Sequence, residues 1–444
     1  MTTTTMMMKR YPVYKDSGIE WLGEIPEYWE MKRLKYTFHV VNGSTPRSSE
    51  PAYWDGDIVW VTPEDLGNLR SEVIFAAARM ITKEGYSSCG TTLVPKDSLV
   101  LSTRAPIGHL ARAGVPLCTN QGCRSLVFHK DSNHPFFFYQ ILAAKQELQS
   151  WGQGSTFMEL SKERLESITI ITPPLVEQQA IANYLDRQTA KIDALIAKKE
   201  RQIELLKEKR IALISHAVTK GLNPAATMKD SGTEWLGEIP EHWEIFQIRR
   251  AIDRFVDYRG KTPEKTQNGV CLVTAGNIKN GFIDYSLCED FIRQEDYEDW
   301  MVRGLPEIGD VLITTEAPLG ESAQVDNPNI ALAQRIILLK ANKHRISNEY
   351  LKCYIRSKSG IAELWSRATG STAVGIKAWH LKEILIIVPP LAEQQAIADY
   401  LDHETAKIDV LIAKIQLSID KLKEYRTALI PAAVTGKIDL RGEA

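Results

Sequence analysis

The sequence predicts an α+β fold in which two domains of mixed helix and strand are joined by two long helices, which form an antiparallel coiled coil with internal pseudo-two-fold symmetry. Three observations lead to this prediction. Two blocks of sequence occur twice, a helical heptad pattern follows each copy of the second block, and short β-rich runs fill the segments between the blocks. At 444 residues the chain also exceeds the length that one hydrophobic core usually serves, which favours more than one domain.

Two blocks of the sequence are written twice. The segment Lys15–Glu30 recurs at Lys229–Glu244 with two substitutions, and Pro173–Lys198 recurs at Pro389–Lys414 with five. Because both blocks keep nearly the same offset, the segments between them are duplicated in register as well. The repeat therefore predicts one architecture that is built twice.

The segments between the copied blocks, about residues 31–168 and 245–384, resemble each other only at sparse landmarks. Each contains short β-rich runs broken by Gly, Pro, Asn and Ser turns, which predicts compact α+β material. Near-identical blocks around diverged inserts suggest that the blocks do one job symmetrically while each insert meets a different target. The runs are 57–61, 98–102, 309–314 and 330–340, and the paired landmarks are Gly43–Pro46 with Gly260–Pro263, Ala105–Gly108 with Ala317–Gly320, and Gly154–Thr156 with Gly370–Thr372.

Each copy of the second block continues as a helix without internal glycine or proline for about forty residues. Apolar residues recur at alternating steps of three and four, which is a heptad seam, and arginine stands at the matching seam positions 210 and 426. One such helix alone would most simply be a core helix. Two matched seams predict instead that the helices pair with each other in antiparallel orientation over ~60 Å. The seam residues are Ile192, Ile196, Ile203, Leu206 and Leu213 in the first copy and Ile408, Ile412, Ile415, Ile419, Leu422 and Leu429 in the second.

The composition is that of a folded protein without a membrane span. Hydrophobic residues make up 44% of the chain and charged residues 25%, and the net charge is −2. No apolar run approaches the ~20 residues that a membrane helix needs, so we expect a cytoplasmic protein. Because the charges nearly balance, any surface that binds nucleic acid must be a local basic patch.

The six cysteines are scattered along the chain. None forms the short paired spacings of a zinc site or of a secreted disulfide framework. We therefore expect reduced, structural cysteines and no bound metal.

Loops beside the shared landmarks carry side chains that can read DNA bases. Arginine pairs with guanine, and Asn or Gln with adenine, through two hydrogen bonds in the major groove. A lone surface Arg or Asn is usually only solvated, so it is the position beside landmarks of both inserts that makes these residues candidates. The candidates are Ser44, Thr45, Arg104, Asn120, Gln121, Arg124, Ser155 and Thr156 in the first insert, and Arg259, Lys261, Thr262, Asn277, Lys279, Thr315, Gln334, Arg335, Ser371 and Thr372 in the second.

The doubled KDSG-x-EWLGEIPE-x-W opening, the doubled PPL-x-EQQAIA-x-YLD helix start, and the GSTP and RAPIG-type landmarks resemble the specificity subunits of Type I restriction-modification systems. The resemblance covers nearly the whole chain. In that family each insert is a target recognition domain that reads one half of an asymmetric, bipartite DNA site, and the helices separate the two domains. The inserts are the family's variable part, so its individual base contacts do not transfer by motif.

The resemblance also implies partners and a domain plan. The chain would be a non-catalytic subunit that binds double-stranded DNA, docks two methyltransferase (M) subunits and joins restriction/motor (R) subunits. It would hold no cofactor, since S-adenosylmethionine, ATP and Mg would be used by the partner subunits in N6-adenine methylation and ATP-dependent cleavage. The expected parts are a disordered tail (1–14), the first target recognition domain with its N-terminal copied segment (15–168), the first spacer helix (169–222), the second target recognition domain with its copied segment (223–384), and the second spacer helix with a C-terminal tail (385–444).

Two other classes of protein compete with this interpretation. A solitary DNA methyltransferase or nuclease would need its own site, and an adenine methyltransferase needs an Asp/Asn-Pro-Pro-aromatic motif for the flipped base. The nearest strings, 172–175 and 388–391, lack the acid or amide and the aromatic ring, and there is no phosphate loop for ATP. A pure coiled-coil scaffold would leave both inserts idle, and a DNA pull-down would distinguish it.

Overall fold

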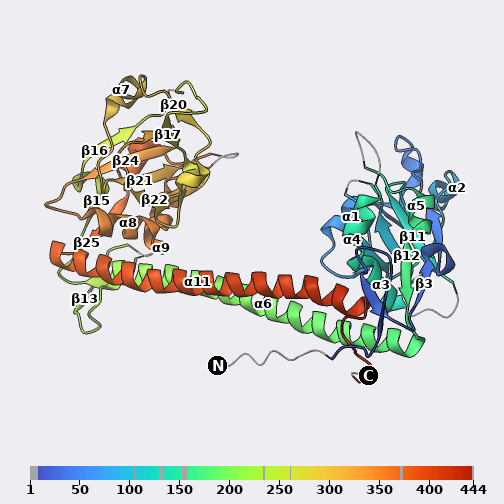
Figure 1. Cartoon of the computed structure of the whole chain (residues 1–444). Helices are drawn as coiled ribbons and strands as arrows, with labels where there is room; N and C mark the ends of the chain where they lie inside the picture. The colour runs from blue at the N-terminus through green and yellow to red at the C-terminus, as the bar shows by residue number, and fades with distance from the viewer. Residues whose placement is uncertain are drawn as a thin grey trace. The chain divides into compact units, whose positions relative to one another are not determined.

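The computed structural model describes residues 9–104, 106–129, 134–152, 158–233, 236–260, 262–370 and 374–442. The chain divides into two compact units: unit 1 comprises Met1–Lys198 with Ser418–Ala444, and unit 2 comprises Lys199–Leu417. In Figure 1 the insert of unit 1 runs from blue to blue-green and that of unit 2 from yellow to orange. The boundary between the units falls inside each long helix, so each unit includes part of both helices.

The insert of unit 1 contains a mixed sheet with the strand order β4–β11–β8–β9–β6 and a smaller sheet with the order β10–β5–β7. All four residues of β8 are buried, because neighbouring strands flank it and side chains cover both of its faces. The larger sheet consists of β4 (Phe38–Asn42), β6 (Val73–Ile74), β8 (Leu99–Ser102), β9 (Leu110–Ala113) and β11 (Cys123–Phe128), and the smaller of β5 (Trp54–Val61), β7 (Met80–Ile81) and β10 (Leu117–Thr119).

Helices of unit 1 bring aromatic side chains into one core. Phe136, Phe137 and Tyr139 on α3 are buried together with Leu185 of the first long helix and Leu429 of the second. The core of unit 1 therefore includes one half of each long helix. The helices of the insert are α1 (Pro63–Asn68), α2 (Lys83–Ser87), α3 (His134–Ala143), α4 (Lys145–Ser150) and α5 (Lys162–Ser167), with the 3-10 helices η1 (Leu34–Tyr36) and η2 (Pro51–Tyr53).

Unit 2 repeats this topology. Its sheets have the strand orders β16–β24–β21–β22 and β20–β17–β23, which match β4–β11–β8–β9 and β7–β5–β10 of unit 1. The strands are β16 (Ile252–Asp257), β17 (Val270–Val273), β20 (Phe291–Ile292), β21 (Val311–Thr315), β22 (Leu319–Gln324), β23 (Ala331–Leu332) and β24 (Ile336–Ala341), with a hairpin of β18 (Ile278–Lys279) and β19 (Phe282–Ile283). The helices are α7 (Tyr297–Trp300), α8 (Asn348–Arg356), α9 (Lys358–Ser366) and α10 (Ala378–Leu381), with the 3-10 helices η3 (Ile248–Arg250), η4 (Ala275–Asn277), η5 (Tyr285–Leu287) and η6 (Met301–Arg303).

Each insert begins and ends on the same antiparallel ladder. In unit 1, β3 (Glu30–Arg33) pairs with β12 (Thr169–Thr172), and in unit 2, β15 (Glu244–Gln247) pairs with β25 (Leu385–Val388). The copied block before each ladder forms a hairpin, β1 (Tyr14–Asp16) with β2 (Glu24–Pro26) and β13 (Met228–Asp230) with β14 (Glu238–Pro240). Because the strands at its two ends pair with each other, the chain enters and leaves each insert at the same place.

One glutamate joins the copied blocks of unit 1. The Glu177 carboxylate accepts hydrogen bonds from Tyr28 Oη at 2.8 Å, Trp29 Nε1 at 3.1 Å and Tyr11 Oη at 3.1 Å. Trp29 is fully buried, so its indole N–H depends on this acceptor. Burial, together with the hydrogen bond and the charge of Glu177, raises the pKa of Tyr28 to about 12.

Unit 2 contains the same junction with one substitution. Trp243 Nε1 donates to the Glu393 carboxylate at 3.0 Å, and His242 Nε2 lies 2.6 Å from the other carboxylate oxygen. His242 stands where unit 1 has Tyr28. In each unit the first copied block packs against the first turn of the long helix, and this helix begins in the second copied block. This contact explains why the two blocks recur together.

The long helices are α6 (Leu175–Lys220, 46 residues) and α11 (Leu391–Val434, 44 residues). All residues of the predicted seam are buried or half-buried, while most of their helical neighbours are exposed. Within unit 1, Arg426 of α11 lies against Asp193 of α6, and within unit 2, Arg210 of α6 lies against Asp409 of α11. In both units a residue early in one helix meets a residue late in the other, which confirms the antiparallel pairing.

The structure differs from the predicted boundaries at the tail, at the start of both spacer helices and in one β-rich run. The disordered tail was predicted too long: residues 1–8 lie outside the described residues, but Tyr11 is buried and Lys9 O accepts a hydrogen bond from Asp439 N. The two spacer helices were predicted from residues 169 and 385, where the ladder strands β12 and β25 stand instead. The run 330–340 is two strands, because residues between β23 and β24 form a loop.

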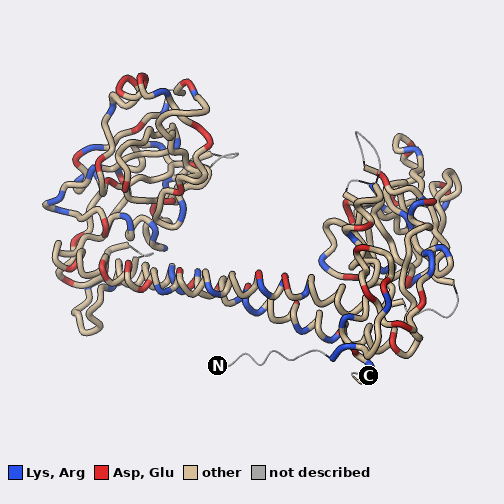
Figure 2. Tube along the Cα trace, viewed as in Figure 1, with Lys and Arg blue, Asp and Glu red and all other residues tan. Residues whose placement is uncertain are grey.

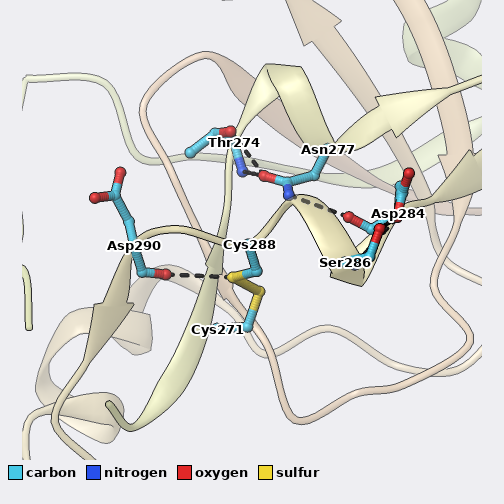
Figure 3. The surroundings of a disulfide bond; sticks show 7 residues. All are labelled: Cys271, Thr274, Asn277, Asp284, Ser286, Cys288 and Asp290. Carbon is cyan, nitrogen blue, oxygen red and sulfur yellow. Dashed lines mark hydrogen bonds between the residues drawn. A yellow bond between two sulfur atoms is a disulfide. The ribbon is translucent and has the colours of Figure 1, made fainter. Parts of the chain in front are cut away.

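The prediction that every cysteine is reduced is wrong for one pair. Cys271 and Cys288 form a disulfide, whereas Cys89, Cys118, Cys123 and Cys353 are free. Figure 3 shows how β17 and the loop before β20 bring the two sulfurs together, next to Asn277. A spacing of 17 residues gave no signal, because it is the tertiary fold that places the Cα atoms 6.2 Å apart.

Within the described part of the chain, no helix has the length and apolar character needed to cross a membrane. Figure 2 shows Lys and Arg interspersed with Asp and Glu along both long helices and in both inserts. The near-balance of charge in the sequence is therefore also local.

Candidate nucleic-acid interface

Two loops of unit 1 that carry predicted residues meet at one end of the smaller sheet. Ser44 N donates to Thr119 O at 2.9 Å, and Asn120 N donates to Val61 O at 3.0 Å. The Thr45 hydroxyl donates a hydrogen bond to the Gln121 side-chain carbonyl. Ser44, Thr45, Asn120 and Gln121 thus form one polar cluster, although the two pairs are far apart in the sequence.

The close approach of these loops requires a glycine. A Cβ atom at Gly43 would lie 2.0 Å from the carbonyl oxygen of Asn120, so no other residue fits there without moving backbone. The shared landmark Gly43–Pro46 therefore marks a place where two loops touch. Its function in the fold is to hold Ser44 and Thr45 beside Asn120 and Gln121.

Two tryptophans of β5 donate hydrogen bonds to the loop that carries Ser44 and Thr45. Trp60 Nε1 donates to Ser44 O at 3.0 Å, and Trp54 Nε1 donates to Arg47 O at 3.2 Å. The two indoles pack edge to face, with ring centroids 5.1 Å apart, and the guanidinium of Arg79 lies 3.4 Å from the Trp54 ring. Sequence reasoning missed this support, although tryptophan at two positions of one strand beside the landmark was a visible signal.

Arg104 and Arg124 share one carboxylate. Arg104 Nη2 lies 3.0 Å from Glu159 Oε2, and Arg124 Nη2 lies 3.4 Å from Glu159 Oε1. The Arg104 side chain is 43% exposed and can reach a ligand, whereas that of Arg124 is 10% exposed and burial lowers its pKa. Arg124 is therefore removed from the candidates for DNA contact. Its guanidinium orients Glu159 and is not presented at the surface.

The corresponding loops of unit 2 also meet. Gln334 Nε2 donates to Thr262 Oγ1 at 2.5 Å, which repeats the pairing of Gln121 with Thr45. Arg335 Nε lies 2.7 Å from Glu316 Oε1, and the Arg335 side chain is 58% exposed. Thr262, Gln334 and Arg335 are thus brought together.

The side chains of three other candidates of unit 2 have different surroundings. Arg259 is half-buried, where it pairs with Asp257 at 2.8 Å and donates to Ile376 O at 3.0 Å. Lys279 is exposed on the β18–β19 hairpin, where it pairs with Phe282 and not with the loop of Thr262. Thr315 is a correction, because it is buried within β21.

Asn277 is also removed from the candidates for DNA contact, and its contacts reveal a motif that was missed in the sequence. Its amide oxygen accepts from Thr274 N at 2.8 Å and from Thr274 Oγ1 at 2.7 Å, while its Nδ2 donates to Asp284 O at 3.2 Å. The side chain is buried and its hydrogen bonds are used internally (Figure 3). Thr62 and Asp65 form the same capping box in unit 1, and the Thr-x-x-Asp/Asn spacing was its signal.

Five candidates, Ser155, Thr156, Lys261, Ser371 and Thr372, lie outside the described residues. Among the residues that the structure does describe, no group of three or more His, Cys, Asp or Glu is arranged to hold a metal ion. The described candidates that stay at the surface therefore offer hydroxyl, amide and guanidinium groups on closely packed loops.

Known proteins resemble this chain over nearly its whole length. The model of the Type I restriction modification DNA specificity domain matches residues 26–205 and again 240–420. The MjaIX specificity subunit of a Type I restriction enzyme from Methanocaldococcus jannaschii is 27% identical, covering 94% of this chain and 95% of the relative. The EcoBI specificity subunit from Escherichia coli is 23% identical, covering 97% and 90%.

Two solved structures share the fold. A chain from a study of complex assembly and conformational transition of the type I R-M system has a TM-score of 0.65 at 15% identity, covering 93% of this chain and 99% of that one. The HsdS subunit from Thermoanaerobacter tengcongensis has a TM-score of 0.54 at 14% identity, covering 95% and 100%. With two copies of the specificity domain across most of its length, this chain belongs to the family of Type I restriction-modification specificity subunits.

Proposed function

We propose that the chain binds an asymmetric, bipartite DNA target, with one insert reading each half, and that it has no catalytic site of its own. The observation that carries this proposal is the matched pair of polar loops. Thr45 with Gln121 and Thr262 with Gln334 occupy the same place in the two units. Amide and hydroxyl groups can contact base edges and phosphates of DNA. The side chains next to them differ between the two units, so the two inserts would read different base sequences.

The charged residues beside these loops support two different readers. At the position where unit 1 has Arg104, unit 2 has Glu316, and each acid or base finds a partner of opposite charge nearby. An arginine held by a carboxylate has a fixed direction before DNA arrives, so less conformational entropy is lost when its guanidinium meets guanine. The exposed arginine comes from a different strand end in each unit.

The helices support a second part of the proposal, that they separate the readers and dock two methyltransferase subunits, which restriction/motor subunits then join. Their outer faces expose apolar side chains, and Leu195 of α6 and its copy Leu411 of α11 are 46% and 48% exposed. An apolar residue at the same outward position of both copies fits two identical partners that bind equivalent surfaces. S-adenosylmethionine, ATP and Mg would then be used by the partners.

Reconstitution tests this proposal. The chain would be mixed with methyltransferase subunits of its own host, and transfer of labelled methyl groups to duplex DNA would be measured with and without it. We expect sequence-specific adenine methylation only when the chain is present, and none from the chain alone. Methyl transfer by the isolated chain, or equal methylation in its absence, would contradict the proposal.

A further inference from the structure

Unit 2 contains a pocket of about 380 Å³ among its candidate DNA-reading loops. Its apolar lining comes from Leu272, Ala275, Ala317 and Ala333, and its polar lining includes the Thr262 hydroxyl and the Gln334 amide. The exposed guanidinium of Arg335 lies at its rim.

Larger side chains stand at the matching positions of unit 1. Asn120 N donates to Val61 O in the way that Ala333 N donates to Val273 O, at 3.0 and 2.9 Å, so Ala333 corresponds to Asn120. Counting along the strand and the turn from Val61 and Val273, Leu272 corresponds to Trp60 and Ala275 to Pro63. Trp60 is buried and hydrogen-bonded to the Ser44 loop. Three side chains of unit 1 are thus replaced by smaller ones around the pocket of unit 2.

The rim residue Arg335 depends on this difference. Thr315 N donates to Arg335 O at 2.9 Å, as Thr103 N donates to Gly122 O at 2.8 Å, so Arg335 corresponds to Gly122. A Cβ atom at Gly122 would lie 2.8 Å from the Cγ atom of Pro63, which leaves no room for a side chain. In unit 2 alanine replaces this proline, and position 335 carries an arginine.

We propose that this pocket receives the edge of one nucleobase of the DNA half-site read by unit 2, a contact that the more filled site of unit 1 does not make. This inference rests on the proposed function. The methyl groups of Ala275, Ala317 and Ala333 suit an apolar base edge, such as the 5-methyl group of thymine. At the rim, the Arg335 guanidinium is held by Glu316 and offers hydrogen-bond donors to the same or the adjacent base pair.

The test fills the pocket. Ala333 is half-exposed on the loop, so an Ala333→Phe side chain would occupy the pocket from its rim. The full chain, in complex with its methyltransferase subunits, would methylate a library of duplexes in which the half-site read by unit 2 is randomised and the other half is fixed. We expect the preference at one base pair of the randomised half to change by about tenfold or more, because one base contact is lost. Ala362→Phe, at an exposed position of α9, is the matched control.

The outcomes separate the pocket from the proposed function. If Ala333→Phe methylates the library with the wild-type preference at every position, the pocket does not read a base. If the wild-type complex itself shows no sequence preference in either half, the proposed function fails first. Should Ala333→Phe not fold, as judged by its thermal unfolding, Ala275→Pro provides a second test, which alters the pocket and the space beside Arg335 together, since unit 1 carries proline at the corresponding helix start. An unchanged preference in a folded Ala275→Pro complex would equally overturn the inference.

Discussion

Arg426 Nε lies 3.2 Å from Asp193 Oδ1 across the helix pair of unit 1, and the copy of this contact in unit 2 is Arg210 with Asp409. Arg426 Nη2 also lies 3.3 Å from Glu72, which belongs to the insert. One guanidinium thus holds α6, α11 and the insert of unit 1 together. Burial raises the pKa of Glu72 above 4.5, and the charge of Arg426 opposes this rise.

We expect Arg426→Ala to lower the free energy of unfolding of unit 1 by ~1–2 kcal/mol at pH 7, between the values for exposed and buried ion pairs. Without Arg426 the pKa of Glu72 rises further. A carboxyl whose pKa is higher in the folded state costs stability as pH rises through its unfolded value, so the loss should be smaller near pH 4.5 than at pH 7. Urea unfolding at both pH values measures this, and a loss independent of pH would contradict the role given to Glu72.

The copied junctions predict a second, paired result. Glu177→Ala leaves the buried indole N–H of Trp29 and the Tyr11 hydroxyl without an acceptor, at a cost of ~1–3 kcal/mol for each group. Glu393→Ala removes the acceptor of Trp243 and the partner of the exposed His242, so we expect it to cost less. Thermal unfolding of the two variants and the wild type makes the comparison. Equal losses would mean that Tyr11 adds nothing to the junction of unit 1.

Thiol chemistry tests the disulfide and the buried cysteines. Burial raises the pKa of Cys118 and of Cys353 to about 11, so these thiols should react slowly with Ellman's reagent at pH 8, while the half-buried Cys89 reacts first. After denaturation without reductant we expect four reactive thiols, and after reduction all six cysteines. Six thiols without reduction would show that Cys271 and Cys288 are not joined.

Arg104 and Arg335 are exposed arginines beside the two loop clusters, and each should serve one half-site. In the methyltransferase complex, Arg104→Ala should relax one base position in the half read by unit 1, and Arg335→Ala one in the half read by unit 2. Each loss should be ~1–3 kcal/mol if the contact is to a base, whereas loss of a phosphate contact weakens all sequences alike. Binding to randomised duplexes distinguishes these cases. Unchanged affinity and unchanged preference in both variants would return the arginines to ordinary solvated surface.

The repeats and the helical seam could be predicted from sequence, because both are periodic and local. A seam position such as Ile203 is recognisable from its neighbours three and four residues away. Ser44, Thr45, Asn120 and Gln121 could be named as candidates from sequence, but their clustering could not be predicted, because the contact between the two loops depends on the tertiary fold. The role of each side chain could not, because burial of Arg124 and Thr315 depends on which strands flank them. Asn277 was misassigned because a capping amide and a base-reading amide have the same composition.

We propose that each unit is a separate reader, and exchange of one insert tests this proposal most directly. The paired strands Glu244–Gln247 and Leu385–Val388 close the insert of unit 2, so residues 245–384 can be replaced by the segment of a relative that ends on the same ladder. Methylated adenines would then be mapped by single-molecule sequencing of DNA from cells that carry the exchanged chain and its partner subunits. We expect one half of the methylated motif to change while the other half keeps its bases. A motif in which both halves change, or neither does, would contradict it.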